Sequence, residues 1–306
     1  MLSILNSIPN AVGQGLIWGI MAIGVYITFR ILDIADLTVD GSFTTGAAVA
    51  AISITNGVPP LAATAAAFGA GLVAGCVTGL LHTKGKINGL LAGILTMIAL
   101  YSINLRIMGT SNLSLLREDT LITPLRENGY LGGAVAIALF ALLALGVKLF
   151  LDWFLHTDLG LAMQATGDNQ EMVSSFGVST DRMKILGLAL SNGFVGLCGA
   201  MVAQYQGFAD IGMGIGLILV GLASVIIGQA IFGSRLIVVS TLAVVLGAVV
   251  YRIVIALALD LGFEPNDMKL ISAVLVVLAL ILPQWKLFRR LPTFSSLRKS
   301  TVTTAS

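Results

Sequence analysis

Long apolar blocks recur along almost the whole chain, and they restrict its possible folds more than any other feature. A membrane-spanning helix needs about 20 predominantly apolar residues. Blocks close to this length cover 11–29, 61–81, 87–105, 130–151, 185–205, 213–232, 236–259 and 268–285, and a shorter block covers 42–54. The sequence therefore predicts an all-α polytopic membrane protein with about eight or nine membrane-spanning helices, of which the second is short or broken.

Composition excludes a soluble fold and several classes of enzyme. Hydrophobic residues make up 57% of the 306 residues and charged residues only 10%, whereas ordinary globular chains are about 25% charged. Cys76 and Cys198 lie in apolar blocks without a CxxC pair, so we interpret them as packing residues. The chain has no GxxxxGK[ST], HExxH or GxSxG motif. We therefore expect no catalytic site, no metal site and no cofactor bound by this chain.

Basic residues predict the orientation of the chain, because lysine and arginine are retained in cytoplasmic loops. Most of them fall on one side if the polar segment 157–184 is cytoplasmic. This arrangement predicts an outside N-terminus and one transmembrane domain over 1–287. It also predicts a basic, disordered cytoplasmic tail over 288–306.

The polar segment 157–184 lies between strongly apolar blocks and predicts a structured surface loop. We expect Gly160 and Gly167 to break the backbone. Asp168 is placed to cap a short helix over 169–176, because Glu171 three positions later completes a capping box.

This predicted helix would begin at Asn169 and place Met172, Val173 and Phe176 on one apolar face. Gly177 follows where a left-handed helix cap is easiest for a residue without a Cβ atom. The pattern leaves two interpretations open: the helix fills a groove on a partner, or it rests on its own protein.

Carboxylates also follow the first apolar block. Asp33, Asp36 and Asp40 are costly in hydrocarbon, so their segment must face cytosol, a water-filled cavity or protein. We expect this segment to end at Gly41 and Ser42, where the second helix begins. Unwound segments at membrane depth often mark solute paths. A plain cytoplasmic turn, with Asp36 or Asp40 capping the next helix, remains the alternative.

Other polar groups lie inside the apolar blocks. Asn104, Asn192, Gln204 and Gln229 should face the bundle interior, where they contact a polar solute or form hydrogen bonds between helices. Arg252 is close enough to the outer end of its block to extend toward the interface or to pair with an acidic residue. The middles of the long blocks otherwise lack the carboxylates that ion-coupled transporters place there.

Four motifs occur in the order known from one family. They are DLTVDGS at 36–42, HTKGKINGLLAG at 82–93, the LG(x)6GDN and FGVSTDRMKI pair within 157–184, and IGMGIGLILVGLASVIIGQAIFGS at 211–234. From about Gly13 to Pro283, the chain resembles the ABC importer permeases that serve branched-chain amino acids, ribose and related solutes. It looks closest to an uncharacterised subgroup associated with aromatic amino acids, tryptophan or tyrosine.

The resemblance implies a permease that translocates a small polar solute and is not itself an enzyme. Its expected partners are a dimer of ATPase subunits that binds ATP and Mg²⁺, an extracytoplasmic solute-binding protein, a second permease copy in a homodimer, and the lipid of a bacterial inner membrane, but no nucleic acid. An ion-gradient-driven secondary transporter is the alternative. The expected ATPase-coupling residues are Gly160, Gly167, Asp168, Asn169, Glu171, Met172, Val173, Phe176 and Gly177; the expected path residues are Asp36, Asp40, Ser42, Asn192 and Gln204.

Overall fold

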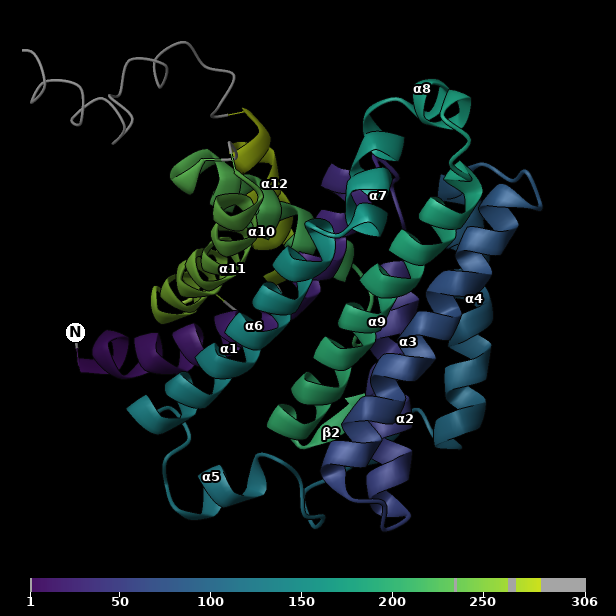
Figure 1. The fold of residues 1–306 in the computed structure, drawn as a ribbon. Helices are drawn as coiled ribbons and strands as arrows, with labels where there is room; N and C mark the ends of the chain where they lie inside the picture. The colour runs from purple at the N-terminus through teal and green to yellow at the C-terminus, as the bar shows by residue number, and fades with distance from the viewer. Residues whose placement is uncertain (1, 234–235, 264–267, 282–306) are drawn as a thin grey trace, which may run out of the picture.

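The computed structural model describes residues 2–233, 236–263 and 268–281, which form a bundle of helices (Figure 1). The first half contains α1 (Leu2–Tyr26), the π-helical turn η1 (Ile27–Ile31), α2 (Thr38–Thr55), α3 (Pro60–Thr83), α4 (Gly89–Met108), β1 (Asn112–Ser114), α5 (Thr123–Glu127) and α6 (Ala134–Leu155). The second half contains α7 (Asp158–Asp168), α8 (Gln170–Ser175), α9 (Thr180–Gln206), β2 (Phe208–Asp210), α10 (Leu217–Phe232), α11 (Ile237–Asp260) and α12 (Met268–Ile281).

Six spans in the described part of the chain are long and apolar enough to cross a membrane. They are Ile8–Ile31, which joins α1 to η1, together with α3, α4, α6, α9 and α11. The helix α10 is apolar but shorter. The expected class, an all-α membrane protein, is therefore confirmed, while the count of eight or nine spans stays a prediction.

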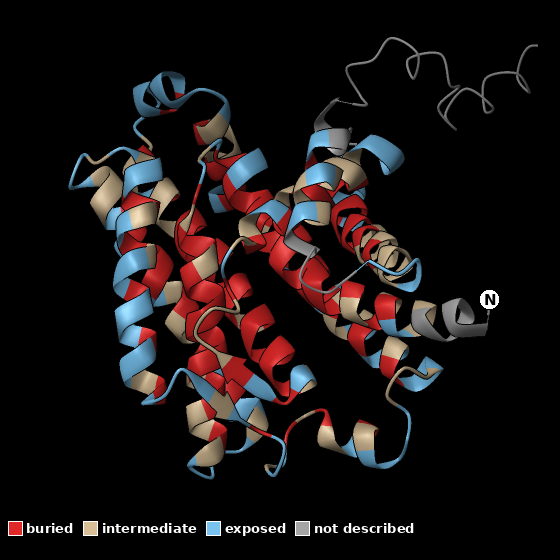
Figure 2. Ribbon diagram, turned by 180° about the vertical axis from the view of Figure 1, so that it is seen from behind, coloured by how far each residue is buried: buried red, intermediate tan, exposed pale blue. Residues whose placement is uncertain are grey.

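Burial separates the central helices from the outer ones. In the most apolar window of α1 and η1, 83% of the residues are buried, and in that of α9 the share is 78%, against 28% for α4. Large apolar side chains such as Leu91, Ile98 and Leu142 are exposed on α4 and α6, and Figure 2 shows exposed residues along the outer helices around a buried centre. Such surfaces are suited to contact with lipid tails, because apolar side chains need no hydrogen-bond partners and the helices pair their own backbone polar groups.

Small residues bring the helix backbones together. Gly71, Gly75 and Gly79 of α3 all face α9, and a Cβ atom on Gly71 or Gly75 would overlap a backbone carbonyl oxygen of that helix. On α1, Gly15 and Gly19 face α11 in the same way. Close approach of this kind increases van der Waals contact, which drives helix association in lipid.

The bundle has two distinct ends, with α8 at one and α5 at the other (Figure 1). The α5 end also carries a short antiparallel sheet in which Asn112 of β1 pairs with Asp210 of β2. The sequence did not predict this sheet, because strands of three residues give too little alternation to recognise. The predicted tail over 288–306 lies outside the described residues.

Candidate functional site

The bundle has a first break between η1 and α2, over residues 32–37. Here Asp36 bonds to Asn192 of α9, which is 12 residues from the start of that helix and 14 from its end (192 − 180 and 206 − 192). At 1.5 Å per residue these distances are about 18 and 21 Å, so the break lies near the middle of the bundle. The prediction that α2 begins at Gly41 and Ser42 is wrong, since the helix starts at Thr38.

Asp36 is the carboxylate at the centre of this break and is only 2% exposed. Its Oδ1 accepts a hydrogen bond from the backbone N–H of Thr38 at 2.9 Å, and its Oδ2 accepts one from Nδ2 of Asn192 at 2.6 Å. The first bond satisfies an N–H that the start of α2 would leave unpaired. The side chain of Asp36 thus binds the first turn of α2 from the position before the N-cap residue, Leu37, and the segment is a buried break rather than a plain surface turn.

A second break follows α9, over residues 207–216, before α10 begins. With 16 residues, α10 spans about 24 Å, less than the roughly 30 Å of a bilayer core. Its first turn is capped by Asp40 of α2, whose Oδ2 accepts from the N–H of Gly216 at 2.7 Å and whose Oδ1 accepts from that of Ile218 at 2.9 Å. Asp40 thus caps α10, whereas the alternative from the sequence was that Asp36 or Asp40 caps α2.

The N-terminal ends of α2 and α10 therefore meet inside the bundle, each bound by a carboxylate. Helix N-termini carry partial positive charge, which Asp36 and Asp40 offset. Interrupted helices persist at membrane depth where they line a cavity or are buried in protein, and they often form solute sites in transporters. This meeting point is the candidate solute path; the roles of the two aspartates in transport stay predictions.

The other predicted path residues are divided between two places. The hydroxyl oxygen of Ser42 is buried in α2 without a hydrogen-bond partner, and Asn192 joins the first break. By contrast, Gln204 accepts a hydrogen bond from the N–H of Leu121 at 3.1 Å and donates one to Thr64 at 2.8 Å. Both partners of Gln204 are protein groups, so its side chain connects α9 to α3 and to the segment before α5.

A cavity of about 400 Å³ adjoins the second break. Within its wall, the guanidinium carbon of Arg252 lies 3.8 Å from the centroid of the Trp18 ring. The sequence offered two positions for Arg252, extended to the interface or paired with an acidic residue; in the described part of the chain its guanidinium packs on this aromatic ring and pairs with no carboxylate. The lining residues are Trp18, Gly212, Met213, Ile215, Gly216, Leu217, Leu219, Val220, Tyr251, Arg252, Ile255 and Ser272.

At the α8 end, the polar segment folds into two helices where one was predicted. Gly160 and Gly167 do not break the backbone, since both lie inside α7. A Cβ atom on Gly160 would overlap the carbonyl oxygen of Phe154, and one on Gly167 would overlap that of Ile31. These glycines therefore let α7 pack closely on the end of α6 and on η1, a long-range requirement that local sequence does not reveal.

The predicted capping box around α8 is also wrong. Asp168 is the last residue of α7, and α8 is capped one position later by Asn169, whose side chain accepts a hydrogen bond from the N–H of Met172 at 2.9 Å. Glu171 lies in the first turn of α8, where a carboxylate interacts favourably with the helix dipole. The existence of a short capped helix is confirmed, with bounds of Gln170–Ser175.

The apolar face of α8 is split between protein and solvent. Val173 is buried, with 4% of its surface exposed, so it does not share the outer face as predicted. Met172 is 48% exposed and Phe176 is 78% exposed. Gly177 then adopts φ +80°, which confirms the predicted left-handed cap. Two large apolar side chains therefore project from the end of the bundle; we call Met172 and Phe176 the α8 tip.

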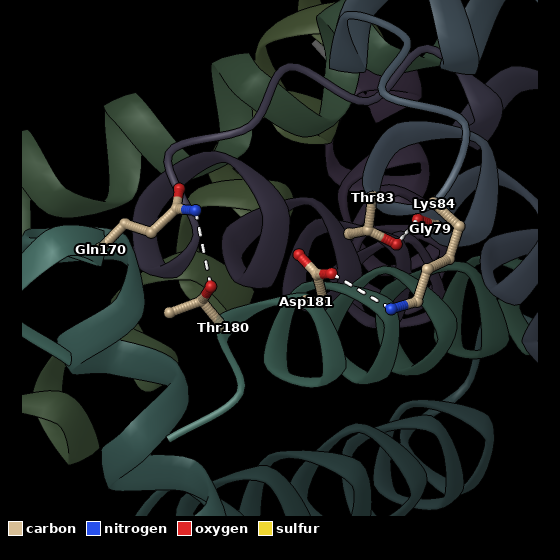
Figure 3. A network of polar contacts seen from close by, with 6 residues as sticks. All are labelled: Gly79, Thr83, Lys84, Gln170, Thr180 and Asp181. Atoms are coloured by element: carbon tan, nitrogen blue, oxygen red, sulfur yellow. Dashed lines mark hydrogen bonds and ion pairs between the residues drawn. The ribbon is translucent and has the colours of Figure 1, made fainter. Parts of the chain in front are cut away.

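Polar contacts hold α8 in place (Figure 3). The side chain of Gln170 donates to Oγ1 of Thr180 at 3.5 Å. It also accepts from Nζ of Lys184 at 2.7 Å. At the start of α9, Asp181 lies 3.4 Å from Nζ of Lys84, beyond the end of α3. The two lysine contacts are exposed and each contributes little to stability, but together the three contacts connect α8, α9 and the end of α3.

One buried ion pair was not predicted. Lys148 and Asp152 of α6 pair one helical turn apart, and the hydroxyl of Thr241 on α11 donates to Asp152 Oδ1 at 2.6 Å. Lys148 and Asp152 are 5% and 7% exposed. The i to i+4 spacing of opposite charges was the available signal. Asp152 lies close to the end of α6, and Asp36 lies in the break before α2, so neither is in the middle of a long apolar block.

Comparison with known proteins identifies the family of this chain. The family described as branched-chain amino acid transport system / permease component matches residues 7–281. A tyrosine transport system permease protein of Clostridioides difficile is 44% identical over 89% of this chain and 90% of its own length. The ribose import permease protein RbsC of Escherichia coli is 25% identical over 92% of this chain and 87% of its own. No solved structure matches the chain at a significant level. The chain belongs to the family of permease components of branched-chain amino acid transport systems.

Proposed function

We propose that this chain is the membrane-spanning subunit of a binding-protein-dependent ABC importer. The observation that carries this proposal is the α8 tip, because Phe176 is 78% exposed at the end of a bundle whose family is a transport permease. An exposed aromatic side chain of this kind is typical of an anchor that fills a partner's pocket. The anchored partner would be a separate ATPase, since this chain lacks the GxxxxGK[ST] phosphate loop.

The remaining partners and the solute are part of the same proposal. An extracytoplasmic binding protein delivers the solute to the α5 end, and two copies of the chain act together as a homodimer. The solute is an amino acid, with an aromatic side chain as the first candidate, because a relative 44% identical to this chain is named a tyrosine transport permease.

Orientation in a bacterial inner membrane is testable by labelling. We propose that the α8 end is cytoplasmic, as the predicted distribution of basic residues requires. In a background without Cys76 and Cys198, a cysteine at exposed Ser175 should react only with reagents that reach the cytosol. A cysteine at Asp119, exposed near the other end, should react from outside. Labelling of Ser175→Cys from outside intact cells would reverse the proposed orientation.

The coupling role of α8 is tested by Phe176→Asp in the assembled transporter. This change would place a carboxylate in the partner's groove, and burying it unpaired costs several kcal/mol. We expect a folded permease that loses its ATPase subunits during purification, or that keeps them without coupling hydrolysis to uptake. A second variant, Gly177→Val, tests the cap alone. An added Cβ would meet no atom within 4 Å there, so only the backbone conformation of φ +80° is strained.

The control for Phe176→Asp is Phe263→Asp, which adds the same charge at an exposed phenylalanine beyond the end of α11. This variant should retain its ATPase subunits. Wild-type ATPase binding and uptake by Phe176→Asp would show that α8 is not the coupling element.

An ion-gradient-driven transporter is the second candidate function, and the buried carboxylates Asp36 and Asp152 favour it. Carboxylates inside a bundle are the groups that such proteins use to bind protons or sodium. The purified chain in liposomes, given only an ion gradient, distinguishes the two functions. Solute accumulation under these conditions would establish the second candidate and refute the first.

A further inference from the structure

The cavity beside the second break has the size and composition of a small-molecule site. Its volume of about 400 Å³ lies within the usual range for ligand pockets of about 300–1,000 Å³. Gly216 forms part of the wall and also donates its N–H to Asp40. The cavity is therefore next to the place where α2 and α10 meet, and we call it the Arg252 pocket.

Arg252 supplies the pocket with a cationic group that is not paired with a carboxylate in the described part of the chain. Among the described residues, no carboxylate forms an ion pair with it, and its buried Nε has no hydrogen-bond partner. The Trp18 ring at 3.8 Å interacts with the guanidinium face and leaves the N–H groups along its edge available. A cation inside a bundle is costly without an anionic partner, so an anion in the pocket would relieve that cost.

The geometry of a guanidinium selects among anions. Its planar fork of N–H donors matches a carboxylate, which accepts two parallel hydrogen bonds. The nearby Tyr251 hydroxyl lies 2.6 Å from Oγ of Ser272, so these two polar groups already satisfy one another. Arg252 is therefore the group in this wall best placed to bind a carboxylate.

The rest of the lining is apolar and suits the body of a solute rather than a sugar. Met213, Ile215, Leu217, Val220 and Ile255 surround the space beside the guanidinium. These side chains offer no hydrogen bonds to hydroxyl groups, and a ribose ring would leave its hydroxyls unpaired at a cost. An amino acid with a large apolar or aromatic side chain fits this lining, because its carboxylate can bind the guanidinium and its side chain can pack on the apolar residues.

We infer that the Arg252 pocket binds amino-acid solutes that have large apolar side chains, with the guanidinium of Arg252 holding their carboxylate. This inference rests on the proposed transport function and adds a substrate class and a specificity-determining residue to it. The same site would bind an amine that lacks the carboxylate only weakly.

The test compares the affinities of two ligands, with and without a carboxylate, for the wild type and for Arg252 variants. Binding is measured on the full-length chain in nanodiscs of zwitterionic lipid. The probes are L-tyrosine and tyramine, its decarboxylated counterpart. Trp18 reports occupancy by fluorescence after Trp153→Phe and Trp285→Phe have removed the other two tryptophans. A hydrogen bond to a charged group accounts for roughly 10-fold to 100-fold in affinity. We expect tyramine to bind more weakly than L-tyrosine by about this factor.

Arg252→Met should weaken L-tyrosine binding by a similar factor and leave tyramine binding almost unchanged. Arg252→Lys, which keeps the charge but not the fork, should fall between wild type and Arg252→Met. Arg117→Met removes an exposed arginine before α5 and should change neither affinity. A loss of affinity for both probes in Arg252→Met would indicate a packing role for Arg252 and would overturn the inference.

Two further results would also overturn the inference. One is equal binding of L-tyrosine and tyramine by the wild type. The other is a fluorescence response to anionic lipid but not to L-tyrosine, which would assign the pocket to a lipid headgroup. Uptake by the complex with its ATPase and binding protein separates this inference from the proposed function. ATP-driven import that is unchanged in Arg252→Met refutes the inference alone, whereas absence of ATP-driven import by the wild type refutes the proposed function.

Discussion

Replacing Asp36 and Asn192 by alanine, singly and together, measures how strongly α9 is held against the break between η1 and α2. The bond between them is 2.6 Å long, and the two residues are 2% and 0% exposed. A hydrogen bond to a charged group contributes about 1.5–3 kcal/mol, and we expect a coupling free energy in this range. Each single substitution also changes the desolvation cost of a buried group, so only the double-mutant cycle isolates the bond.

The assay is reversible unfolding of the permease by SDS in mixed micelles, followed by circular dichroism. Gln204 provides the control, because it lies on α9 with Asn192 but bonds to Leu121 and Thr64. It is 12 residues further along the helix (204 − 192), or about 18 Å. The substitutions Asp36→Ala and Gln204→Ala should therefore be additive to within about 0.5 kcal/mol.

A coupling free energy below about 0.5 kcal/mol between Asp36 and Asn192 would refute the stabilising role of this hydrogen bond. Substitutions at distant, independent sites already deviate from additivity by up to about this amount, and residues in contact should exceed it. The functional counterpart is Asp36→Asn. Its single carboxamide oxygen can accept only one of the two bonds that the carboxylate accepts. We expect uptake to fall while the complex with its ATPase remains assembled; normal uptake would leave Asp36 with the capping role alone.

Two further predictions concern packing inside the bundle. Gly46→Ala should destabilise the permease, because the added Cβ would overlap the carbonyl oxygen of Gly196, whereas Gly146→Ala meets no atom within 4 Å and should be neutral or stabilise α6 by up to about 1 kcal/mol. Lys148→Met should lower the free energy of unfolding by about 3–5 kcal/mol by leaving Asp152 unpaired, and adding Asp152→Leu should restore much of it. The same SDS titrations test both predictions. Equal destabilisation by Gly46→Ala and Gly146→Ala would contradict the first. No recovery of the free energy of unfolding in the Lys148→Met, Asp152→Leu double variant would contradict the second.

The class of the protein and the general position of its polar segments could be predicted from the amino-acid sequence alone. Apolar blocks of membrane-spanning length need no tertiary information, because a bilayer requires each span to satisfy its own backbone hydrogen bonds. Local chemistry likewise located Gly177, whose positive φ is a property of a few neighbouring residues. The ordered motifs identified the family, which the match over residues 7–281 confirmed.

Tertiary structure decided how the polar residues are used, because their partners are distant in the chain. The sequence left open a cap of α2 by Asp40, yet the carboxylate oxygens of Asp40 bind N–H groups about 180 residues later, at the start of α10. From the sequence alone, the glycines of α7 are interpreted as helix breakers. In the structure they lie against carbonyl oxygens of α6 and η1, where a Cβ atom would not fit. Arg252 and Trp18 belong to helices far apart in sequence, so only packing could bring them to one cavity. Such long-range pairs stabilise the fold, because a polar group buried in the bundle without a partner costs free energy.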